Sequence, residues 1–305
     1  MTSIQPFSSD AYLTDVFPRI FENAQSAVEP IYSQAGGLVT QVPSTTAQNI
    51  YTWLSQSPGF REWFGERQIK ELTGNEFIVK NRKFEETLGV DMDDLEDLSK
   101  IASISMWVQK LGESAGQHPD ELLWSYLENE ATSVAHYDGV PLLSAAHPLK
   151  DGSTFSNLIA GAATPWYLLD VSSVEKGLLW QVRKDYEFRT MNAEEPGNVN
   201  GFMTEQHLIG TKARVTAAAG SPFRILKSSA DLTPDNYQTA RSQMRAYKGD
   251  SGRPIRVRPR VLMVPPSLEK LANEIVAAER NTAGASNVLV GTAQVVVNEY
   301  IQDTP

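Results

Sequence analysis

The sequence contains no cysteine among its 305 residues. Disulfides, thiolate nucleophiles and zinc sites built on cysteine are therefore excluded. No run approaches the roughly 20 apolar residues of a membrane helix, and no internal repeat is present. The first residues lack the basic start and apolar stretch of a secretory signal, so we expect none there. The composition fits a reducing compartment.

Common catalytic and phosphate-binding motifs are also missing. Neither G-x-x-x-x-G-K-[ST] nor G-x-G-x-x-G occurs, and no serine lies in G-x-S-x-G. The acidic run from Asp91 to Asp97 lacks the central glycine and the terminal glutamate of an EF-hand loop. We therefore predict no cofactor, no metal and no enzymatic activity.

The charge is predominantly negative, with a net charge of −10. A dedicated nucleic-acid binder needs clustered lysine and arginine, so this balance argues against one. Like charge limits uncontrolled association, which suits a protein that works at high local concentration. An acidic shell can enclose DNA without sequence-specific binding. Hydrophobic residues make up 41%, enough to form a substantial core.

Three residues offer an alternative, enzymatic hypothesis. His136, Asp138 and His147 are close in the sequence and consist of metal-ligating types. If they bind one metal ion with open coordination positions, the protein would be a soluble metallohydrolase. Their spacing matches no helix-borne ligand pair, so histidines in turns that pack or face solvent are the plainer interpretation.

The hydrophobic periodicity predicts short strands mixed with helices, the pattern of an α+β protein. One helix is expected from Leu98, weakening at Gly112 and Gly116 and stopping at His118-Pro119, with a second helix starting near Pro119. Further helices are expected over 16–28, 233–248 with Thr233 as cap, and 267–280 with Ser267 as cap, and strands over 177–191, 202–209, 212–217, 256–266 and 288–301.

The segment 60–97 is long, charged and poor in core pattern. Gly74-Asn75 predicts a turn between two strands, and Ile78, Phe84, Leu88 and Val90 alternate onto one face of the second strand. Such a hairpin is marginal alone. We therefore expect it to contact another copy of the chain.

The residues expected to form inter-subunit contacts are the charged ones of this segment. They are Arg67, Lys70, Lys80, Arg82, Lys83, Glu85, Asp91, Asp93 and Asp94. A charge run is most often a solvated face. The sharper hypothesis pairs the acidic members with basic residues elsewhere, for which one candidate patch is Arg253, Arg256, Arg258 and Arg260.

An ordered series of segments resembles the major head proteins of Mu-like phages. The segments are NRKFEETLGVDMDDLED at 81–97, YDGVPLLSAAHP at 137–148, GLLWQVRKDYEF at 177–188, GFMTEQHLIGTKARVTAAAG at 201–220, LTPDNYQTARSQMRAYKGDSGRPIRVRPRVLMVPPSLE at 232–269 and NVLVGTAQVVVNEYI at 287–301. No single motif is diagnostic, and the resemblance rests on their order over about 58–301.

The resemblance implies a Hong Kong 97-type capsid fold. Its parts would be an N-terminal arm over 1–57, an extended loop over 58–95, a spine helix and peripheral domain over 96–144, an axial domain over 145–255, and return strands and a helix over 256–305.

The function implied is that of a major capsid protein in an icosahedral head around double-stranded DNA. Expected partners are further copies in pentamers and hexamers, a scaffolding protein, a portal and a decoration protein, with no membrane. The expected location is the virion, after assembly in the bacterial host cytoplasm. A nanocompartment shell of the same fold is the nearer alternative, and the metallohydrolase is the remote one.

Overall fold

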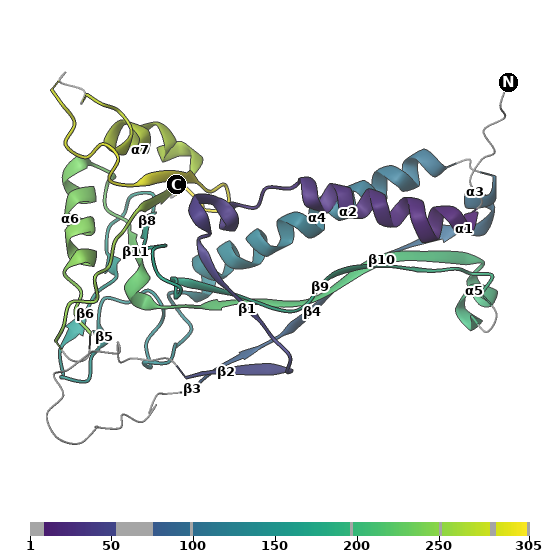
Figure 1. Cartoon of the computed structure of the whole chain (residues 1–305), viewed down its shortest axis with the longest axis horizontal. Helices are drawn as coiled ribbons and strands as arrows, with labels where there is room; N and C mark the ends of the chain where they lie inside the picture. Colours follow the sequence, from purple (N-terminus) through teal and green to yellow (C-terminus); the bar gives the residue numbers. More distant parts are fainter. Residues whose placement is uncertain are drawn as a thin grey trace, which may run out of the picture.

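The computed structural model describes residues 9–52, 76–97, 100–195, 198–249, 252–280 and 285–303. The molecule is elongated, with a compact end that carries α6 and α7 and a long projection that ends near α3 and α5 (Figure 1). Helix and sheet are mixed throughout, which confirms the predicted α+β class. Gly74-Asn75, Arg67 and Lys70 lie outside the described residues.

The compact end is built on a five-stranded sheet of order β13-β12-β8-β11-β7. Its strands are β7 (Leu158–Ile159), β8 (Trp166–Leu169), β11 (Ile225–Ser228), β12 (Val261–Val264) and β13 (Gln294–Val297). Strands β8 and β12 are buried along their whole length, as continuous apolar strands covered on both faces should be.

Alternate side chains of this sheet enter two different cores. Trp166 and Leu168 join the cluster formed with helices α6 (Pro234–Arg245) and α7 (Glu269–Val276). Tyr167 faces the opposite way, into a cluster with the end of the long helix and with the second sheet. Because successive side chains of a strand point to opposite faces, the five-stranded sheet lies between these two hydrophobic clusters.

The projection is a four-stranded sheet of order β1-β9-β10-β4. Its strands are β1 (Val39–Pro43), β4 (Arg82–Asp91), β9 (Leu178–Met191) and β10 (Gln206–Ala219). Strand β10 pairs antiparallel with both β9 and β4, and β1 pairs parallel with β9. Two helices, α2 (Phe17–Ala27) and α4 (Ile101–Ser125), lie along one face of the sheet (Figure 1).

Glycines let α2 and α4 pack closely, contrary to the prediction that they would weaken the long helix. A Cβ on Gly112 would lie 2.5 Å from the carbonyl oxygen of Phe21 and 2.8 Å from Cβ of Ala24. A Cβ on Gly116 would lie 2.8 Å from Cβ of Val28. These positions therefore serve as contact points between helices, which the periodicity of one helix alone does not reveal.

The prediction of a helix stop at His118-Pro119 is also wrong, because α4 continues through Pro119 to Ser125. Directly after the proline, the buried carboxylate of Asp120 accepts hydrogen bonds from the backbone N–H of Ile31 and Tyr32 at 2.7 and 2.9 Å. It also accepts one from Nε1 of Trp124 at 2.9 Å. Tertiary contacts override the local breaker here.

A separate two-stranded ribbon pairs β2 (Gln48–Thr52) with β3 (Glu76–Lys80). It lies beside the sheet on the side away from α2 and α4 (Figure 1). The prediction that Ile78 shares a face with Phe84, Leu88 and Val90 is wrong for Ile78. Asn81 separates β3 from β4, and the two strands belong to different sheets.

Among the other elements, the strand over 177–191 and the helix over 233–248 are confirmed, the latter with Oγ1 of Thr233 accepting from the N–H of Asn236 at 3.2 Å. The strands expected over 202–209 and 212–217 are one strand, β10, whose register against β9 shifts near Lys212, and Phe202 falls in α5 (Val199–Thr204). Ser267 lies in a turn of helix at Pro266–Leu268 and donates to Asp303, so it does not cap α7.

The remaining elements are short. They are α1 (Ser9–Ala11), helical turns at Tyr12–Val16, Ile31–Gly36, Tyr126–Glu130 and Pro222–Arg224, α3 (Met92–Glu96), and the pair β5 (His147–Pro148) and β6 (Thr154–Phe155). No helix in the described part of the chain combines the length and apolarity needed to cross a membrane.

Candidate functional site

Strand β4 forms one edge of the long sheet. Within the described residues it pairs with β10 and with no second strand. An edge strand presents backbone N–H and C=O groups that can pair with another chain. The predicted contact residues of this strand therefore lie on a surface that is open to a partner.

The basic residues at the end of β3 and the start of β4 are exposed. Lys80, Arg82 and Lys83 are all solvent-exposed, and none forms an ion pair with another described residue. The guanidinium of Arg82 lies over the ring of Phe84, 5.2 Å from its centre. Glu85 is exposed and accepts a hydrogen bond from Oγ1 of Thr87 at 2.9 Å. These charges are available for contacts outside their own subunit.

The acidic end of β4 has partners within the chain. Asp91 caps α3, with Oδ1 accepting from the N–H of Asp93 at 3.1 Å. Asp94 pairs with Lys100 at 2.7 Å, and this hydrogen bond raises the pKa of the lysine. Asp93 is exposed. For Asp91 and Asp94 the geometry therefore provides a local structural role beside the predicted inter-subunit one.

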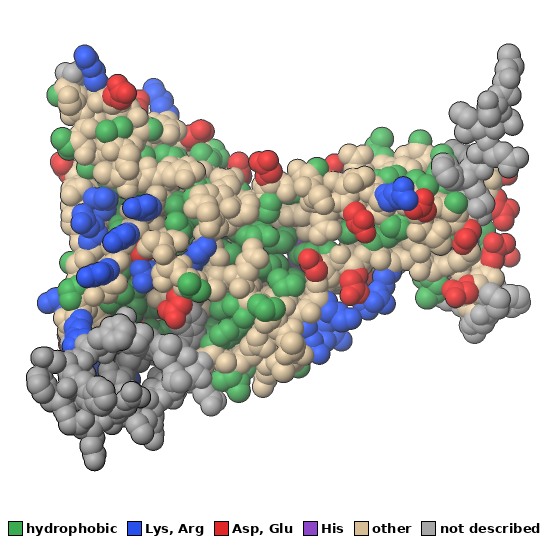
Figure 2. All heavy atoms as spheres, viewed as in Figure 1, with side chains coloured by type: hydrophobic (Ala, Val, Ile, Leu, Met, Phe, Trp, Pro, Cys, Tyr) green, Lys and Arg blue, Asp and Glu red, His purple; other side chains and the backbone are tan. Residues whose placement is uncertain are grey.

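The acidic cluster and the arginine patch lie at opposite ends of the molecule. The cluster surrounds α3 at the tip of the projection, whereas Arg258 and Arg260 lead into β12 at the compact end (Figure 1). Red side chains gather at the tip and blue ones over the compact end (Figure 2). The two groups do not meet within one chain, and their pairing between chains stays a prediction.

The ribbon exposes an apolar pair that sequence reasoning missed. Ile50 and Ile78 are directly opposite in the β2–β3 register and are 53% and 47% exposed. The other face, with Tyr51, Phe77 and Val79, packs onto the long sheet. The alternation within QNIYT and EFIVK is the signal that could have identified this pair. An exposed cross-strand isoleucine pair is a natural contact point for another protein surface.

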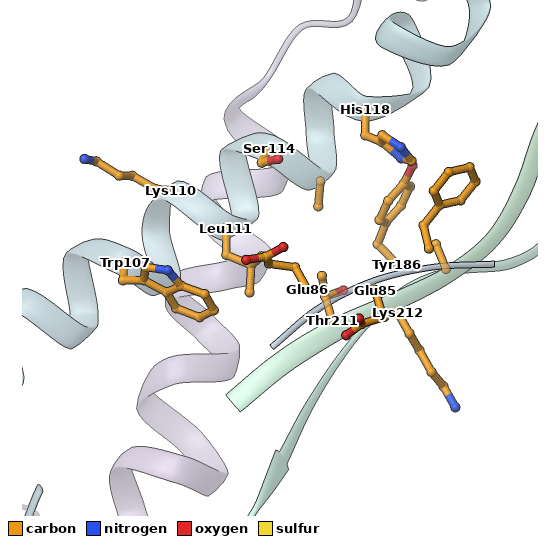
Figure 3. Close-up of a pocket in the computed structure, with 13 residues that line it drawn as sticks. Glu85, Glu86, Trp107, Lys110, Leu111, Ser114, His118, Tyr186, Thr211 and Lys212 are labelled. Carbon is orange, nitrogen blue, oxygen red and sulfur yellow. The ribbon is translucent and has the colours of Figure 1, made fainter. Parts of the chain in front are cut away.

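A cleft of about 430 Å³ lies between α4 and strands β4, β9 and β10. Phe84, Trp107 and Leu111 supply apolar lining, and Glu85 and Glu86 supply carboxylates (Figure 3). This lining places aromatic and aliphatic surface next to the exposed charges of β4. It provides a recess for an apolar side chain at the same surface.

Two titratable groups in the cleft are bonded to each other. Nδ1 of His118 lies 2.5 Å from the hydroxyl of Tyr186. Burial lowers the pKa of His118 and raises that of Tyr186 above its usual range. Both groups are therefore neutral at neutral pH. Their contact links α4 to β9.

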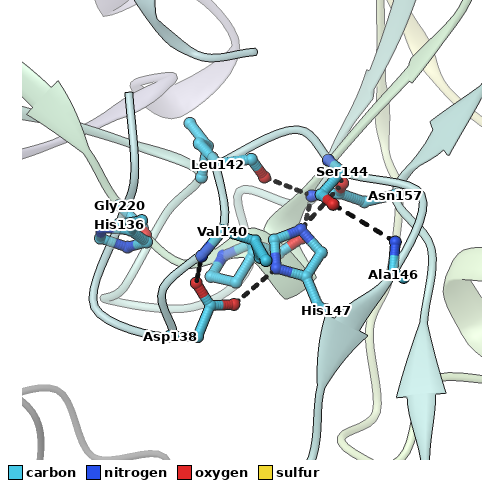
Figure 4. A network of polar contacts seen from close by, with 10 residues as sticks. His136, Asp138, Val140, Leu142, Ser144, Ala146, His147, Asn157 and Gly220 are labelled. Atoms are coloured by element: carbon cyan, nitrogen blue, oxygen red, sulfur yellow. Dashed lines mark hydrogen bonds and ion pairs between the residues drawn. The ribbon is translucent and has the colours of Figure 1, made fainter. Parts of the chain in front are cut away.

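The histidine cluster forms a closed hydrogen-bond network. Nδ1 of His147 lies 2.6 Å from Oδ2 of Asp138, and its Nε2 lies 3.1 Å from Oδ1 of Asn157 (Figure 4). The Asn157 amide orientation is fixed, because its Nδ2 donates to the carbonyls of Leu142 and Pro222. Both ring nitrogens of His147 thus face acceptors, and neither points to an open position.

His136 belongs to a different contact. Its Nε2 lies 2.8 Å from the carbonyl oxygen of Gly220. Its ring packs edge-on against the ring of Phe77, with 4.5 Å between the ring centres. Burial lowers the pKa of His136 to about 4. No group of three or more His, Asp or Glu side chains that could hold a metal occurs among the described residues. The His136–Asp138–His147 hypothesis of a metallohydrolase is therefore not favoured.

The chain is similar in sequence to major head proteins of phage Mu and of Mu-like prophages. A family model described as the Mu-like prophage major head subunit gpT matches residues 11–301. The major capsid protein of Escherichia phage Mu is 31% identical over 290 residues, covering 91% of this chain and 94% of that protein. A Mu-like prophage FluMu major head subunit of Haemophilus influenzae is 29% identical over 275 residues, covering 85% and 86%.

Solved structures agree over nearly the whole chain. A subunit from the procapsid of bacteriophage JBD30 is 33% identical with a TM-score of 0.80, covering 95% of this chain and 98% of that one. A subunit from the JBD30 capsid decorated with minor capsid protein trimers is 26% identical with a TM-score of 0.70, covering 87% and 89%. A subunit from a structure described as the bacteriophage JBD30 capsid shares the fold at 24% identity and a TM-score of 0.73, covering 98% of this chain and 97% of that one.

Proposed function

The chain belongs to the family of Mu-like prophage major head subunits and is a major capsid subunit with the Hong Kong 97-type fold, and from this premise we propose how copies of it are held together. The exposed surface formed by the β2–β3 ribbon and the edge strand β4 contacts neighbouring copies in the shell. The surface joins an apolar pair, the basic residues where β3 meets β4, and a strand edge that no other described strand pairs with.

The observation that carries this proposal is the exposed pair Ile50 and Ile78 beside Lys80, Arg82 and Lys83. One face of the ribbon packs onto the long sheet, but the isoleucine pair on the other face is not buried by the described part of its own chain. Burial of two isoleucines contributes about 1.5–3 kcal/mol each when complete. Many weak contacts of this kind add up in a closed shell, because each subunit is held by several neighbours.

The division of labour along the chain is part of the proposal. Residues 1–57 form an N-terminal arm, 58–95 an extended loop, and 96–144 the spine helix and peripheral domain. Residues 145–255 form the axial domain around fivefold and sixfold positions, and 256–305 return to the peripheral domain. Helix α4, with 25 residues the longest helix of the described chain, supports the assignment of a spine, and the predicted contact residues Arg67 and Lys70 fall in the proposed loop.

The partners proposed are those of a packaging head. Copies form pentamers and hexamers around a scaffolding protein, a portal occupies one vertex, and the finished shell in the virion encloses double-stranded DNA without sequence-specific contacts. Assembly takes place in the bacterial host cytoplasm. A decoration protein on the outside is supported by the minor capsid protein trimers of the JBD30 relative. The subunit itself needs no catalytic activity, and a nanocompartment shell is not favoured by the family match.

The experiment reverses charge at the start of β4. The double variant Arg82→Glu and Lys83→Glu should fold normally but lose most particle formation, because both side chains are exposed and unpaired within the described part of their own chain. A control with the same change of charge away from this surface is Lys248→Glu with Arg280→Glu, because both side chains are exposed and form no ion pair with another described residue.

Circular dichroism measures folding, and negative-stain microscopy with sedimentation measures particles. Normal particles from the β4 variant would contradict the proposed contact surface. Loss of particles from both double variants would show that charge alone, and not this surface, controls assembly.

A further inference from the structure

A second concave site lies at the compact end, away from the proposed contact surface. It is a cavity of about 870 Å³ lined by α6, by the segment leading into β12 and by the turn before β13. Four arginines line it: Arg241, Arg245, Arg258 and Arg260. Lysine and arginine side chains gather over this end of the molecule in a chain that is acidic overall (Figure 2).

The local structure brings the four guanidinium groups to one cavity. Arg241 and Arg245 are four residues apart on α6, so they share one face of the helix. Arg258 and Arg260 flank the buried Pro259. The carbonyl oxygen of Arg260 accepts a hydrogen bond from the N–H of Gln294 at 2.7 Å, which fixes this segment against the start of β13. The arginines thus come from two elements that the fold holds in place.

None of the four guanidinium groups pairs with a carboxylate of the described chain. Asp170 lies next in sequence to lining residues, but its oxygens are already occupied. Its Oδ2 accepts from Arg224 and from the backbone N–H of Arg258, and its Oδ1 accepts from Ser172. Asp170 therefore does not neutralise the positive charge of the four arginines.

One arginine that lines the cavity has a buried donor without a partner. Nε of Arg241 is inaccessible to solvent and makes no hydrogen bond to another described residue. Such groups are rare in folded proteins because each costs the lost hydration of a charged donor. Holding four like charges around one cavity adds repulsion. A bound anion would remove this repulsion.

We propose that this cavity binds an anion that carries several phosphate groups. Guanidinium groups donate paired hydrogen bonds that match phosphate oxygens, and four of them suit an anion with more than one phosphate. The volume admits either a free polyphosphate or a stretch of phosphodiester backbone. The shared chemistry is clustered phosphate, and binding does not depend on base sequence.

Binding is measured by isothermal titration of the purified full-length chain with sodium tripolyphosphate and with a duplex of about 20 base pairs at low salt. The double variant Arg241→Gln and Arg258→Gln should weaken binding at least about tenfold, because two charged hydrogen-bond donors are lost. The control Arg183→Gln and Lys184→Gln removes the same charge from β9 and should change affinity less than about threefold.

The two arms distinguish the sources of phosphate. Binding of tripolyphosphate alone assigns the cavity to a free polyphosphate, and binding of duplex in competition with tripolyphosphate assigns it to a nucleic-acid backbone. No binding of either probe, or equal losses in both double variants, would overturn the proposal. A third outcome would also overturn the proposal: a peptide of residues 91–97 binds and neither phosphate probe does. The cavity would then bind carboxylates of a second copy. Particle formation of the same variants tests shell assembly separately.

Discussion

The compact end and the projection solve the problem of stability differently. At the compact end, the β13-β12-β8-β11-β7 sheet is covered on both faces, and Trp166 and Tyr167 are fully buried on opposite sides. In the projection, β4 has an open edge and the adjoining ribbon exposes Ile50 and Ile78. One region closes its core within the chain, whereas the other leaves apolar and backbone groups uncovered by the described residues, and we propose that a neighbouring copy covers them.

The difference separates folding from assembly. Changes in the compact core should act on the stability of the single subunit, because no partner is needed to bury it. Changes on the ribbon and on β4 should act on the association of subunits while leaving the fold intact. Four predictions test this separation, beginning with the largest expected effect.

Truncation in the compact core should be the most damaging. Leu262 is fully buried between β8 and β13, and Leu262→Ala is expected to cost about 2–5 kcal/mol of unfolding free energy by leaving a cavity. Urea unfolding of the soluble subunit measures it. The control Val288→Ala, at an 89% exposed residue, should change stability by less than about 0.5 kcal/mol. A similar loss from both would contradict the assignment of the core.

Acid should weaken the junction between the ribbon and the compact end. His136 contacts Phe77 of β3, and burial lowers its pKa to about 4 in the folded chain, against about 6.5 when unfolded. Between these values the unfolded state binds more protons, so stability falls as the pH drops from about 6.5 to about 4. The maximal loss is about 3 kcal/mol.

The variant His136→Gln tests this titration. Unfolding free energy measured across this pH range should fall less steeply in the variant than in the parent chain. Identical slopes would show that His136 does not carry the effect.

Closing the gap between the helices should have an intermediate effect. Gly112→Ala places a Cβ 2.5 Å from the Phe21 carbonyl oxygen and should cost about 1–3 kcal/mol, although alanine is the better helix former. Ser103→Ala, at an exposed position of the same helix, is the matched control and should be neutral or slightly stabilising. Thermal unfolding distinguishes them. Stabilisation by Gly112→Ala would mean that α2 does not lie this close.

The ribbon should show the smallest effect on folding. Ile50→Thr with Ile78→Thr keeps β-branched side chains, so the unfolding free energy should change by less than about 1 kcal/mol. Particle yield should nevertheless fall, because the apolar pair no longer buries surface against a neighbour. Sedimentation compares yields with Val174→Thr, an 87% exposed control at the compact end. Unchanged yield would place the ribbon outside the subunit contacts.

Local patterns predicted the elements that depend on local chemistry. The cap and proline at Thr233 and Pro234 identify α6, and the segment 177–191 is correctly predicted to be a strand, β9. The same reasoning failed at Gly112 and Pro119, where α2 and the buried Asp120 decide the outcome. Those partners are distant in sequence, so the periodicity of one segment contains no information about them.

The candidate sites show the same division. The composition of the segment identifies the charged residues of β4 as candidates; Arg82, Lys83, Glu85 and Asp91 are exposed, and their contacts between subunits stay a prediction. The Ile50–Ile78 pair depends on cross-strand register, and the four-arginine cavity depends on α6 packing beside the segment before β12. Arg258 and Arg260 were recognised as a basic patch, whereas Arg241 and Arg245 were not, because only tertiary structure brings them together.

The pairing of β9 and β10 along the projection has a mechanical consequence. Each strand has 14 residues, which at about 3.3 Å per residue spans about 46 Å. With α2 and α4 fixed along it, this unit behaves as a stiff lever. A tilt of one degree at the compact end then displaces the far tip by about 0.8 Å. A rotation of a few degrees would therefore move the outermost residues by several ångströms relative to a neighbouring subunit.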